Sequence, residues 1–144
     1  MILGFTGTHF GMAPRQLKAV RQLLFNVKEL HLGDCVGADA EAYEEAKRLG
    51  IITVGHPPNN ARFRAFLSYD KEDEPKPYLK RNWSIVYAGV DGLIAAPKTF
   101  VEPTNFRGQG TWTTVRYARQ VRRTIWIVRP DGKVTQECMK PFGA

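Results

Sequence analysis

Residues 30–42 read LHLGDCVGADAEA and contain the kind of transition that decides the fold of this chain. An apolar segment ends at Gly33, a short polar turn with two aspartates follows, and a run rich in Ala and Glu begins at about Asp39. An apolar run that passes through turn residues into a helical composition is typical of a strand leading into a helix. The stretch therefore predicts one strand-to-helix unit.

The same order recurs along the rest of the sequence. Short apolar or β-branched runs predict strands at 2–6, 29–32, 51–54, 91–96 and 124–128. Apolar residues at helical spacing predict helices at 14–25, 39–49, 78–88 and 111–121. The segments 56–78 and 97–107 predict long loops, and the tail after the turn at Asp131 and Gly132 has room for a further short strand.

Strands that alternate with helices predict an α/β fold with a mostly parallel sheet of about five strands and helices on both faces. The length of 144 residues suits one domain with a sizeable core, so we expect residues 1–144 to form a single domain. In such sheets ligands bind outside the carboxyl ends of the strands, near the point where the strand order reverses. The turn at Gly33 and Asp34 lies at such an end.

The composition indicates which class of binding partner and which cellular compartment to expect. The net charge is +7, which suits an anionic partner such as a nucleotide, a nucleic acid or a phosphate ester. No apolar run is long enough to span a bilayer, and the first residues carry no basic segment typical of a secretory signal, so no membrane association is expected. Cys35 and Cys138 are the only cysteines and form no CxxC pair, which favours two reduced thiols in a cytoplasmic protein.

Three predicted strand-to-helix turns, at 7–11, 33–39 and 107–111, are rich in glycine. Glycine lets backbone N–H groups approach an anion closely, and a helix N-terminus adds unpaired donors and a partial positive charge. Together the turns predict a phosphate cradle at one edge of the sheet. Their spacing is neither a P-loop nor a GxGxxG fingerprint, so tight turns without a ligand remain the alternative.

Several polar side chains on these turns are candidates for ligand contact. Asp39 is either the N-cap of its helix or part of the site. Asp34 is less easily explained as a cap, and its carboxylate is suited to accept hydrogen bonds from a sugar. His9, in the first turn, is the histidine best placed to touch a ligand, whereas Cys35 fits a small buried thiol. No histidine has metal-ligand spacing, so neither a metal nor a cofactor is expected.

Arginines supply further candidates. Arg81 opens the helix at 78–88, and its planar guanidinium suits phosphate or carboxylate. Arg116, Arg119 and Arg123 share one helical face, which is either a solvated surface or a track for nucleic acid. The segment 62–66, RFRAF, interleaves basic and aromatic residues and fits either base stacking or a lid packed by its own side chains.

The combined motifs GFTGTHFG, LHLGDCVGADAEA, YLKRNWSIV, DGLIAAP and GQGTWTTVRYAR resemble the SLOG superfamily over residues 2 to about 131. This superfamily includes the LOG phosphoribohydrolases and the DprA/Smf DNA-processing proteins. The resemblance implies a Rossmann-like, doubly wound sheet with a nucleotide site. By resemblance, Gly7, Thr8 and 108–111 hold phosphate, Gly33 and Asp34 lie beside the sugar, and Arg81 faces the ligand. The full set of expected nucleotide-binding residues is Gly7, Thr8, His9, Gly33, Asp34, Gly37, Asp39, Arg81, Asn82, Pro97, Arg107, Gly108, Gly110 and Thr111.

One departure from the LOG pattern bears on activity. LOG enzymes carry PGGxGTxxE, whose glutamate acts with an arginine to cleave the N-glycosidic bond of a nucleoside monophosphate, and Thr114 stands at the glutamate position here. Hydrolysis of that type therefore requires Asp34 or Asp39 to substitute, and no catalytic residue is predicted. Three functions remain: a nucleotide-binding module, a nucleotide N-glycosidase or related transferase, and a DprA-like binder of single-stranded nucleic acid. The pairing of LOG relatives also makes a homodimer an expectation.

Overall fold

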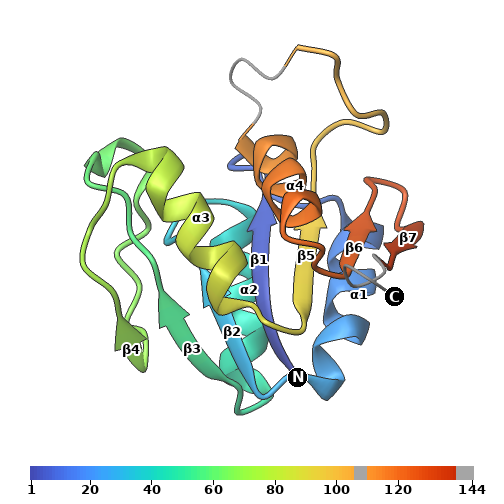
Figure 1. Ribbon diagram of the computed structural model, residues 1–144. Coiled ribbons are helices and arrows are strands. Elements are labelled where there is room, and N and C mark those ends of the chain that lie inside the picture. The colour runs from blue at the N-terminus through green and yellow to red at the C-terminus, as the bar shows by residue number, and fades with distance from the viewer. Residues whose placement is uncertain (106–109, 139–144) are drawn as a thin grey trace.

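The computed structural model describes residues 1–105 and 110–138. Among these residues, seven strands form one sheet in the order β4-β3-β2-β1-β5-β6-β7 (Figure 1). The strands are β1 (Ile2–Gly7), β2 (Glu29–Leu32), β3 (Ile52–Gly55), β4 (Lys71–Glu72), β5 (Gly92–Ala96), β6 (Ile125–Val128) and β7 (Val134–Glu137). All neighbouring pairs are parallel except β6 and β7, which are antiparallel.

Four α-helices within the described residues cover the sheet. They are α1 (Pro14–Leu23), α2 (Ala38–Arg48), α3 (Tyr78–Ala88) and α4 (Gly110–Gln120), with the 3₁₀ turns η1 (Leu24–Asn26) and η2 (Ala61–Phe63). Figure 1 shows α3 and α4 on one face of the sheet and α1 and α2 on the other. None of the helices in the described part of the chain combines the length and apolar character needed to cross a bilayer.

The α/β class, the parallel sheet and the helices on both faces are confirmed, and the expected count of about five strands was slightly low. The two additional strands lie at the edges of the sheet. β4 has only two residues, Lys71 and Glu72, both exposed, and it therefore lacks the apolar run that marks a strand in sequence. β7 is mostly exposed and follows the turn at Gly132, in the tail where the sequence has room for a short strand.

The core consists of two apolar layers, one on each face of the sheet. Phe5 and Leu32 pack in the layer between the sheet and helices α1 and α2, and Trp112, which belongs to α4, packs with Ile127 of β6 in the layer on the other face. Strand β5 is buried along its whole length because its alternate side chains enter opposite layers. A continuous apolar run, rather than an alternating one, is what such a central strand requires.

The strand order reverses beside β1, which pairs with β2 on one side and with β5 on the other. The loops after β1, β2 and β5 consequently meet at one edge of the sheet. Backbone hydrogen bonds join them: the Thr8 N–H donates to the Ala96 carbonyl at 3.0 Å, and the Ala38 N–H donates to the Thr8 carbonyl at 2.9 Å. This is the edge at which the fold class places a ligand.

Candidate functional site

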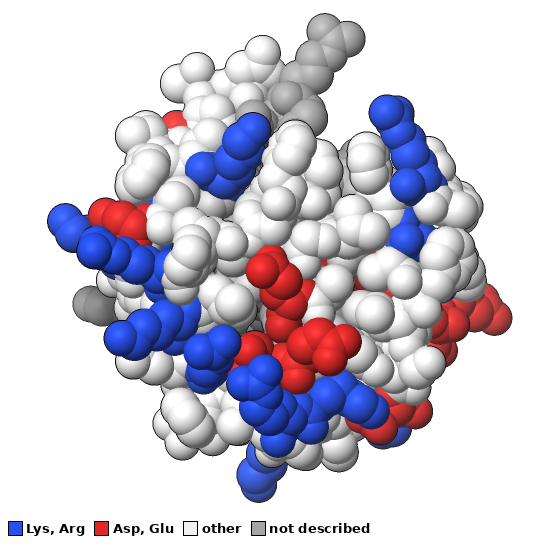
Figure 2. Space-filling view, turned by 180° about the vertical axis from the view of Figure 1, so that it is seen from behind, with Lys and Arg blue, Asp and Glu red and all other residues white. Residues whose placement is uncertain are grey.

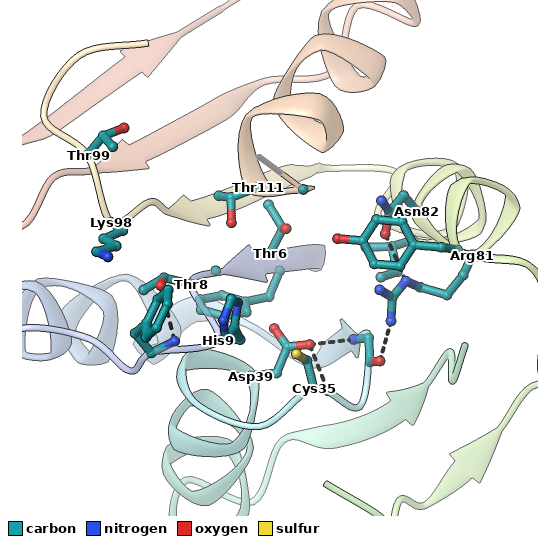
Figure 3. Close-up of a pocket in the computed structure, with 17 residues that line it drawn as sticks. Thr6, Thr8, His9, Cys35, Asp39, Arg81, Asn82, Lys98, Thr99 and Thr111 are labelled. Carbon is teal, nitrogen blue, oxygen red and sulfur yellow. Dashed lines mark hydrogen bonds between the residues drawn. The ribbon is translucent and has the colours of Figure 1, made fainter. Parts of the chain in front are cut away.

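A cavity of about 260 Å³ opens at this edge (Figure 3). Its walls come from the end of β1, the loops after β1, β2 and β5, and the first turns of α2, α3 and α4. Of the expected binding residues, the cavity is lined by Gly7, Thr8, His9, Gly33, Asp39, Arg81, Asn82, Gly110 and Thr111. Sequence positions spread over the whole chain are thus brought together, while the expected residues Arg107 and Gly108 lie outside the described part of the structure.

Arg81 is the buried cation of the site, with only 5% of its surface exposed. Its Nη1 donates to the carbonyl of Gly33 and, at 3.5 Å, to that of His56, while its Nε donates to Oδ1 of Asn82 at 2.8 Å. Glycine at position 33 leaves room for this guanidinium, because a Cβ there would lie 2.6 Å from Nη1 of Arg81 and displace it. The guanidinium therefore fixes the turn after β2 and places a positive charge beside the cavity.

Asn82 has a polar side-chain atom that no described residue pairs with. The residue is 4% exposed and lines the cavity, and its Oδ1 accepts from Arg81. Its Nδ2 is buried and has no hydrogen-bond partner among the described residues. A buried donor without a partner costs about 1–3 kcal/mol, so native structures rarely leave one unless a water or a ligand satisfies it. Asn82 is therefore the strongest indication of an acceptor supplied by a ligand.

Asp39 lies in the first turn of α2 but is not its N-cap, a position that Gly37 takes with a φ of +84°. Its carboxylate turns back instead: Oδ2 accepts from the N–H groups of Gly33 at 3.1 Å and Cys35 at 3.2 Å. Burial raises the pKa of Asp39 to about 6, although Arg81 and these two N–H groups act in the opposite direction. Figure 3 shows its second oxygen directed toward the cavity. Among the described lining residues it is the single carboxylate.

Asp34 does not line the cavity, and the expected contact with a sugar is not supported. It is fully buried, and both oxygens accept from the segment that follows β3. Oδ2 accepts from Nε of Arg64 at 2.7 Å, and Oδ1 accepts from the Leu67 N–H at 3.1 Å and the Tyr69 hydroxyl at 2.9 Å. The carboxylate holds a loop in place, a role that becomes visible only when residues distant in sequence are brought together.

Gly37 and Pro97, also expected in the site, lie beside the cavity without lining it. The positive φ of Gly37 favours glycine, and a Cβ there would clash with the backbone of His9. The carbonyl of Pro97 accepts from Nε2 of the buried Gln16 at 2.8 Å. Both residues shape the loops that carry the site.

Lys98 and Phe10 are lining residues that the sequence did not single out. Nζ of Lys98 lies 4.1 Å from the ring centroid of Phe10, and that ring lies 4.1 Å from the ring of His9. In Figure 3 Lys98 stands at one end of the cavity and Arg81 at the other. Lys98 lies two residues beyond Ala96, where β5 ends, and the rule that ligands bind at strand ends was sufficient to suggest it.

A second cavity, of about 540 Å³, adjoins the first. Both are lined by His9, Cys35, Tyr78, Arg81 and Gly110. The second adds Pro58, Asn60, Arg62, Phe63, Leu79 and Thr113. Phe63, from the basic and aromatic segment 62–66, thereby joins the site, and its ring lies 4.8 Å from that of His9.

Burial shifts the pKa values of Cys35 and of His56 away from their ordinary ranges. Burial raises the pKa of Cys35 to about 12, which keeps the thiol protonated near neutral pH, although the residue is only partly buried rather than fully buried as expected. His31 and His56 share a hydrogen bond of 2.8 Å, and burial lowers the pKa of His56 to about 4. No group of three or more His, Cys, Asp or Glu among the described residues has the arrangement of a metal site.

The arginines on α4 are engaged within the protein. Arg116 and Arg119 pair with Glu102 at 3.1 and 2.8 Å, Arg119 also pairs with Glu137 at 2.8 Å, and Arg123 donates to backbone carbonyls at the end of α3. On the opposite face of the molecule, Lys and Arg stand beside Asp and Glu rather than in an unbroken basic stripe (Figure 2). The ion pairs and hydrogen bonds of Arg116, Arg119 and Arg123 favour a solvated surface, rather than a nucleic-acid track, for this face of α4.

Comparison with known proteins establishes the fold. No protein-family model matches the sequence, and no curated protein sequence matches it significantly. Solved structures that share its architecture include the molybdenum cofactor binding protein from Rippkaea orientalis, with 22% identity, a TM-score of 0.65 and coverage of 88% of this chain and 75% of that chain. The structural-genomics protein TM1055 is 13% identical, with a TM-score of 0.61 and coverage of 85% and 71%.

DNA processing protein A (DprA) from Streptococcus pneumoniae is also similar, with 16% identity, a TM-score of 0.60 and coverage of 87% of this chain. The match spans about half of DprA, 49% of its chain. All three neighbours have SLOG-type Rossmann-like folds. The chain thus has the fold that its resemblance to the SLOG superfamily implied.

Proposed function

We propose that this chain binds a nucleotide or a nucleotide-derived phosphate ligand in the cavity at the carboxyl ends of its parallel strands. The observation that carries the proposal is the buried Nδ2 of Asn82, a cavity-lining residue, because this donor has no hydrogen-bond partner among the described residues. A phosphate oxygen is an acceptor of the kind that this donor lacks.

The electrostatics of the cavity support an anionic ligand. Arg81 and Lys98 both line it, and Gly110 and Thr111 contribute the first turn of α4, where unpaired N–H groups and the helix dipole favour negative charge. The burial that raises the pKa of Asp39 also reduces the opposing negative charge when the pH approaches 6. One structural neighbour is named as a molybdenum cofactor binding protein, so the same fold holds a small-molecule ligand in another protein.

Isothermal titration calorimetry with AMP, GMP, CMP and UMP tests this proposal through the variant Asn82→Asp. This change keeps the acceptor for Nε of Arg81 but replaces the Nδ2 donor with an oxygen. We expect binding of at least one of these nucleotides to the wild type and a loss of roughly tenfold or more in the variant, because a charge-assisted hydrogen bond is replaced by repulsion. Asn26→Asp makes the same chemical change at an exposed position remote from the cavity and is expected to bind normally. Absence of binding, or equal affinities for all three proteins, would contradict the proposal.

A second candidate is a nucleotide N-glycosidase, favoured by the position of Asp39. Thr114, at the position of the LOG glutamate, donates its hydroxyl to the carbonyl of Gly110, whereas Asp39 directs one carboxylate oxygen toward the cavity. In this reaction water adds to C1′ of a nucleoside monophosphate, the glycosidic C–N bond breaks, and the base leaves with a proton, giving ribose 5-phosphate. The ionised Asp39 would stabilise the positive charge that develops on the sugar.

Chromatographic detection of free base separates the two candidates. The glycosidase requires base release that rises with pH through about 6, as Asp39 ionises, and that disappears in Asp39→Asn. The binding module requires an intact nucleotide after prolonged incubation at every pH. Release of base that persists in Asp39→Asn would exclude the proposed role of Asp39.

A further inference from the structure

The second cavity carries an inference that rests on the proposed function. We infer that the ligand consists of two parts, with its phosphate in the first cavity and a planar heterocyclic ring in the second, where the ring stacks on Phe63. The two cavities adjoin, because His9, Tyr78 and Arg81 are among the residues that line both of them. A volume of about 540 Å³ lies within the range of roughly 300–1,000 Å³ usual for small-molecule sites and leaves room that a phosphate alone does not fill.

The walls of the second cavity have the chemistry of a ring-binding site. Phe63, Leu79 and Pro58 supply apolar surface, while Asn60 and Thr113 add polar groups suited to the edge of a heterocycle. Phe63 remains 42% exposed, with its ring supported by His9 at 4.8 Å and by the guanidinium of Arg62 at 5.0 Å. A partly exposed aromatic side chain beside a cavity offers a stacking platform for a planar ring.

Phe63 is held in place before any ligand arrives. Its carbonyl accepts from the Val36 N–H at 2.8 Å, and the Ala65 N–H donates to the carbonyl of Asp34 at 2.8 Å. The Asp34 carboxylate binds Nε of Arg64 at 2.7 Å. The segment 62–66, here called the arm, carries the Phe63 ring and is hydrogen-bonded to the turn after β2. Little conformational entropy of the protein is therefore lost when a ligand ring stacks on Phe63.

Tyr78 gives the arrangement a second aromatic boundary. It lines both cavities, and the guanidinium of Arg81 lies 4.9 Å from the centroid of its ring. The cation of the phosphate cavity is thus in contact with the aromatic wall of the ring cavity. A ligand with an anionic group at one end and a flat ring at the other would contact both the cationic first cavity and the aromatic second cavity. A sugar phosphate alone would contact only the first.

Calorimetry with ribose 5-phosphate and with the tightest-binding nucleotide of AMP, GMP, CMP and UMP tests the inference. We expect the nucleotide to bind wild type roughly tenfold or more tightly than ribose 5-phosphate, since base stacking on an aromatic side chain has an effect of this size. Phe63→Ala should remove most of that advantage and change the affinity for ribose 5-phosphate by less than about twofold. Phe25→Ala, which truncates a 67% exposed phenylalanine remote from both cavities, should leave both affinities unchanged.

Failure of the inference and failure of the proposed function give different results. If ribose 5-phosphate and nucleotides bind but Phe63→Ala leaves their ratio unchanged, the ring cavity is wrongly assigned and phosphate binding stands. If Phe63→Ala weakens both ligands equally, Phe63 supports the fold of the site rather than a ring, and the inference is again overturned. If neither ligand binds the wild type, the proposed function itself fails.

Discussion

At the scale of single residues, Asp39 links the pH of the solution to the charge of the cavity. Its pKa is raised to about 6, principally by burial, so it changes from neutral to ionised between about pH 5 and 7. An ionised carboxylate repels a phosphate bound in the same cavity. The affinity for an anionic ligand is therefore predicted to fall by roughly tenfold as the pH rises from 5 to 8, beyond the change caused by the ligand's own titration.

Comparison of wild type with Asp39→Asn isolates this effect, because the titration of the phosphate is common to both. Calorimetry at pH 5, 6, 7 and 8 should give a ratio of wild-type to variant dissociation constants that grows with pH. A ratio that stays constant across this range would show that Asp39 does not face the anion.

The same residues show what sequence can and cannot reveal at this scale. Arg81 and Asp39 were found because they occupy the turns and helix starts at which α/β folds bind ligands. The unpaired amide of Asn82 was not predictable, because it depends on Oδ1 being engaged by Arg81 while Nδ2 meets no acceptor. Asp34 was assigned to a sugar because its partners, from Arg64 to Tyr69, lie at least thirty residues away in sequence.

At the scale of elements, the loop between β3 and α3 is organised by Asp34. Asp34→Asn suits the backbone, since Asn tolerates the φ of +56° as well as Asp does, but it removes the charge that holds Arg64. We predict that the arm carrying Phe63 loosens, and that the preference for a nucleotide over ribose 5-phosphate falls severalfold while ribose 5-phosphate binds as before. Calorimetry with the two ligands measures this ratio, and circular dichroism confirms that the variant is folded.

A matched control comes from another carboxylate, Asp70, which lies in the same loop and bonds to strand β3. Asp70 accepts from the N–H and hydroxyl of Thr53, away from the lining of both cavities. Asp70→Asn should leave the ligand preference unchanged even if it lowers stability. An equal loss of preference in the two variants would mean that general loosening of this loop, rather than the anchor at Asp34, controls Phe63.

Helices and strands with a clear pattern of apolar residues were predictable from the sequence. Elements that form only by hydrogen bonding to residues far away in the sequence were not. The helix expected at 78–88 coincides with α3, and the helices near 14, 39 and 111 begin within one residue of their expected starts. In contrast, β4 consists of two exposed polar residues that become a strand only by pairing with Val54 and Gly55. The sequence of residues 62–66 suggested either base stacking or a packed lid, but the contacts that hold this segment to the turn after β2 join residues far apart in sequence and were not predictable.

At the scale of the whole molecule, Asp39 and His56 affect stability in opposite directions as the pH changes. The folded-state pKa of His56 is lowered from 6.5 to about 4, so its contribution is fully present above pH 6.5 and is lost as the pH falls toward 4. The folded-state pKa of Asp39 is raised from 3.8 to about 6, so its contribution is present below pH 3.8 and is lost as the pH rises through 6. Each shift corresponds to about 3 kcal/mol at most.

Because the two windows overlap, the free energy of unfolding of the wild type should change little between pH 6 and 4 from these two groups. Asp39→Asn removes one of them, and its stability relative to wild type should fall by up to about 3 kcal/mol as the pH drops from 7 to 4. Urea unfolding curves at several pH values measure this difference. Parallel pH profiles for the two proteins would contradict the assigned pKa of Asp39.

The central claim, that the cavity at the strand ends holds a nucleotide or a related phosphate ligand, is tested most directly by identifying what the protein carries. Mass spectrometry of small molecules released by heat from purified wild type, compared with Asn82→Asp prepared in the same way, is the decisive measurement. The account predicts an intact phosphate-bearing molecule with a heterocyclic ring, enriched in the wild type and depleted in the variant. Equal amounts from both proteins, or a released ligand that lacks phosphate, would contradict it.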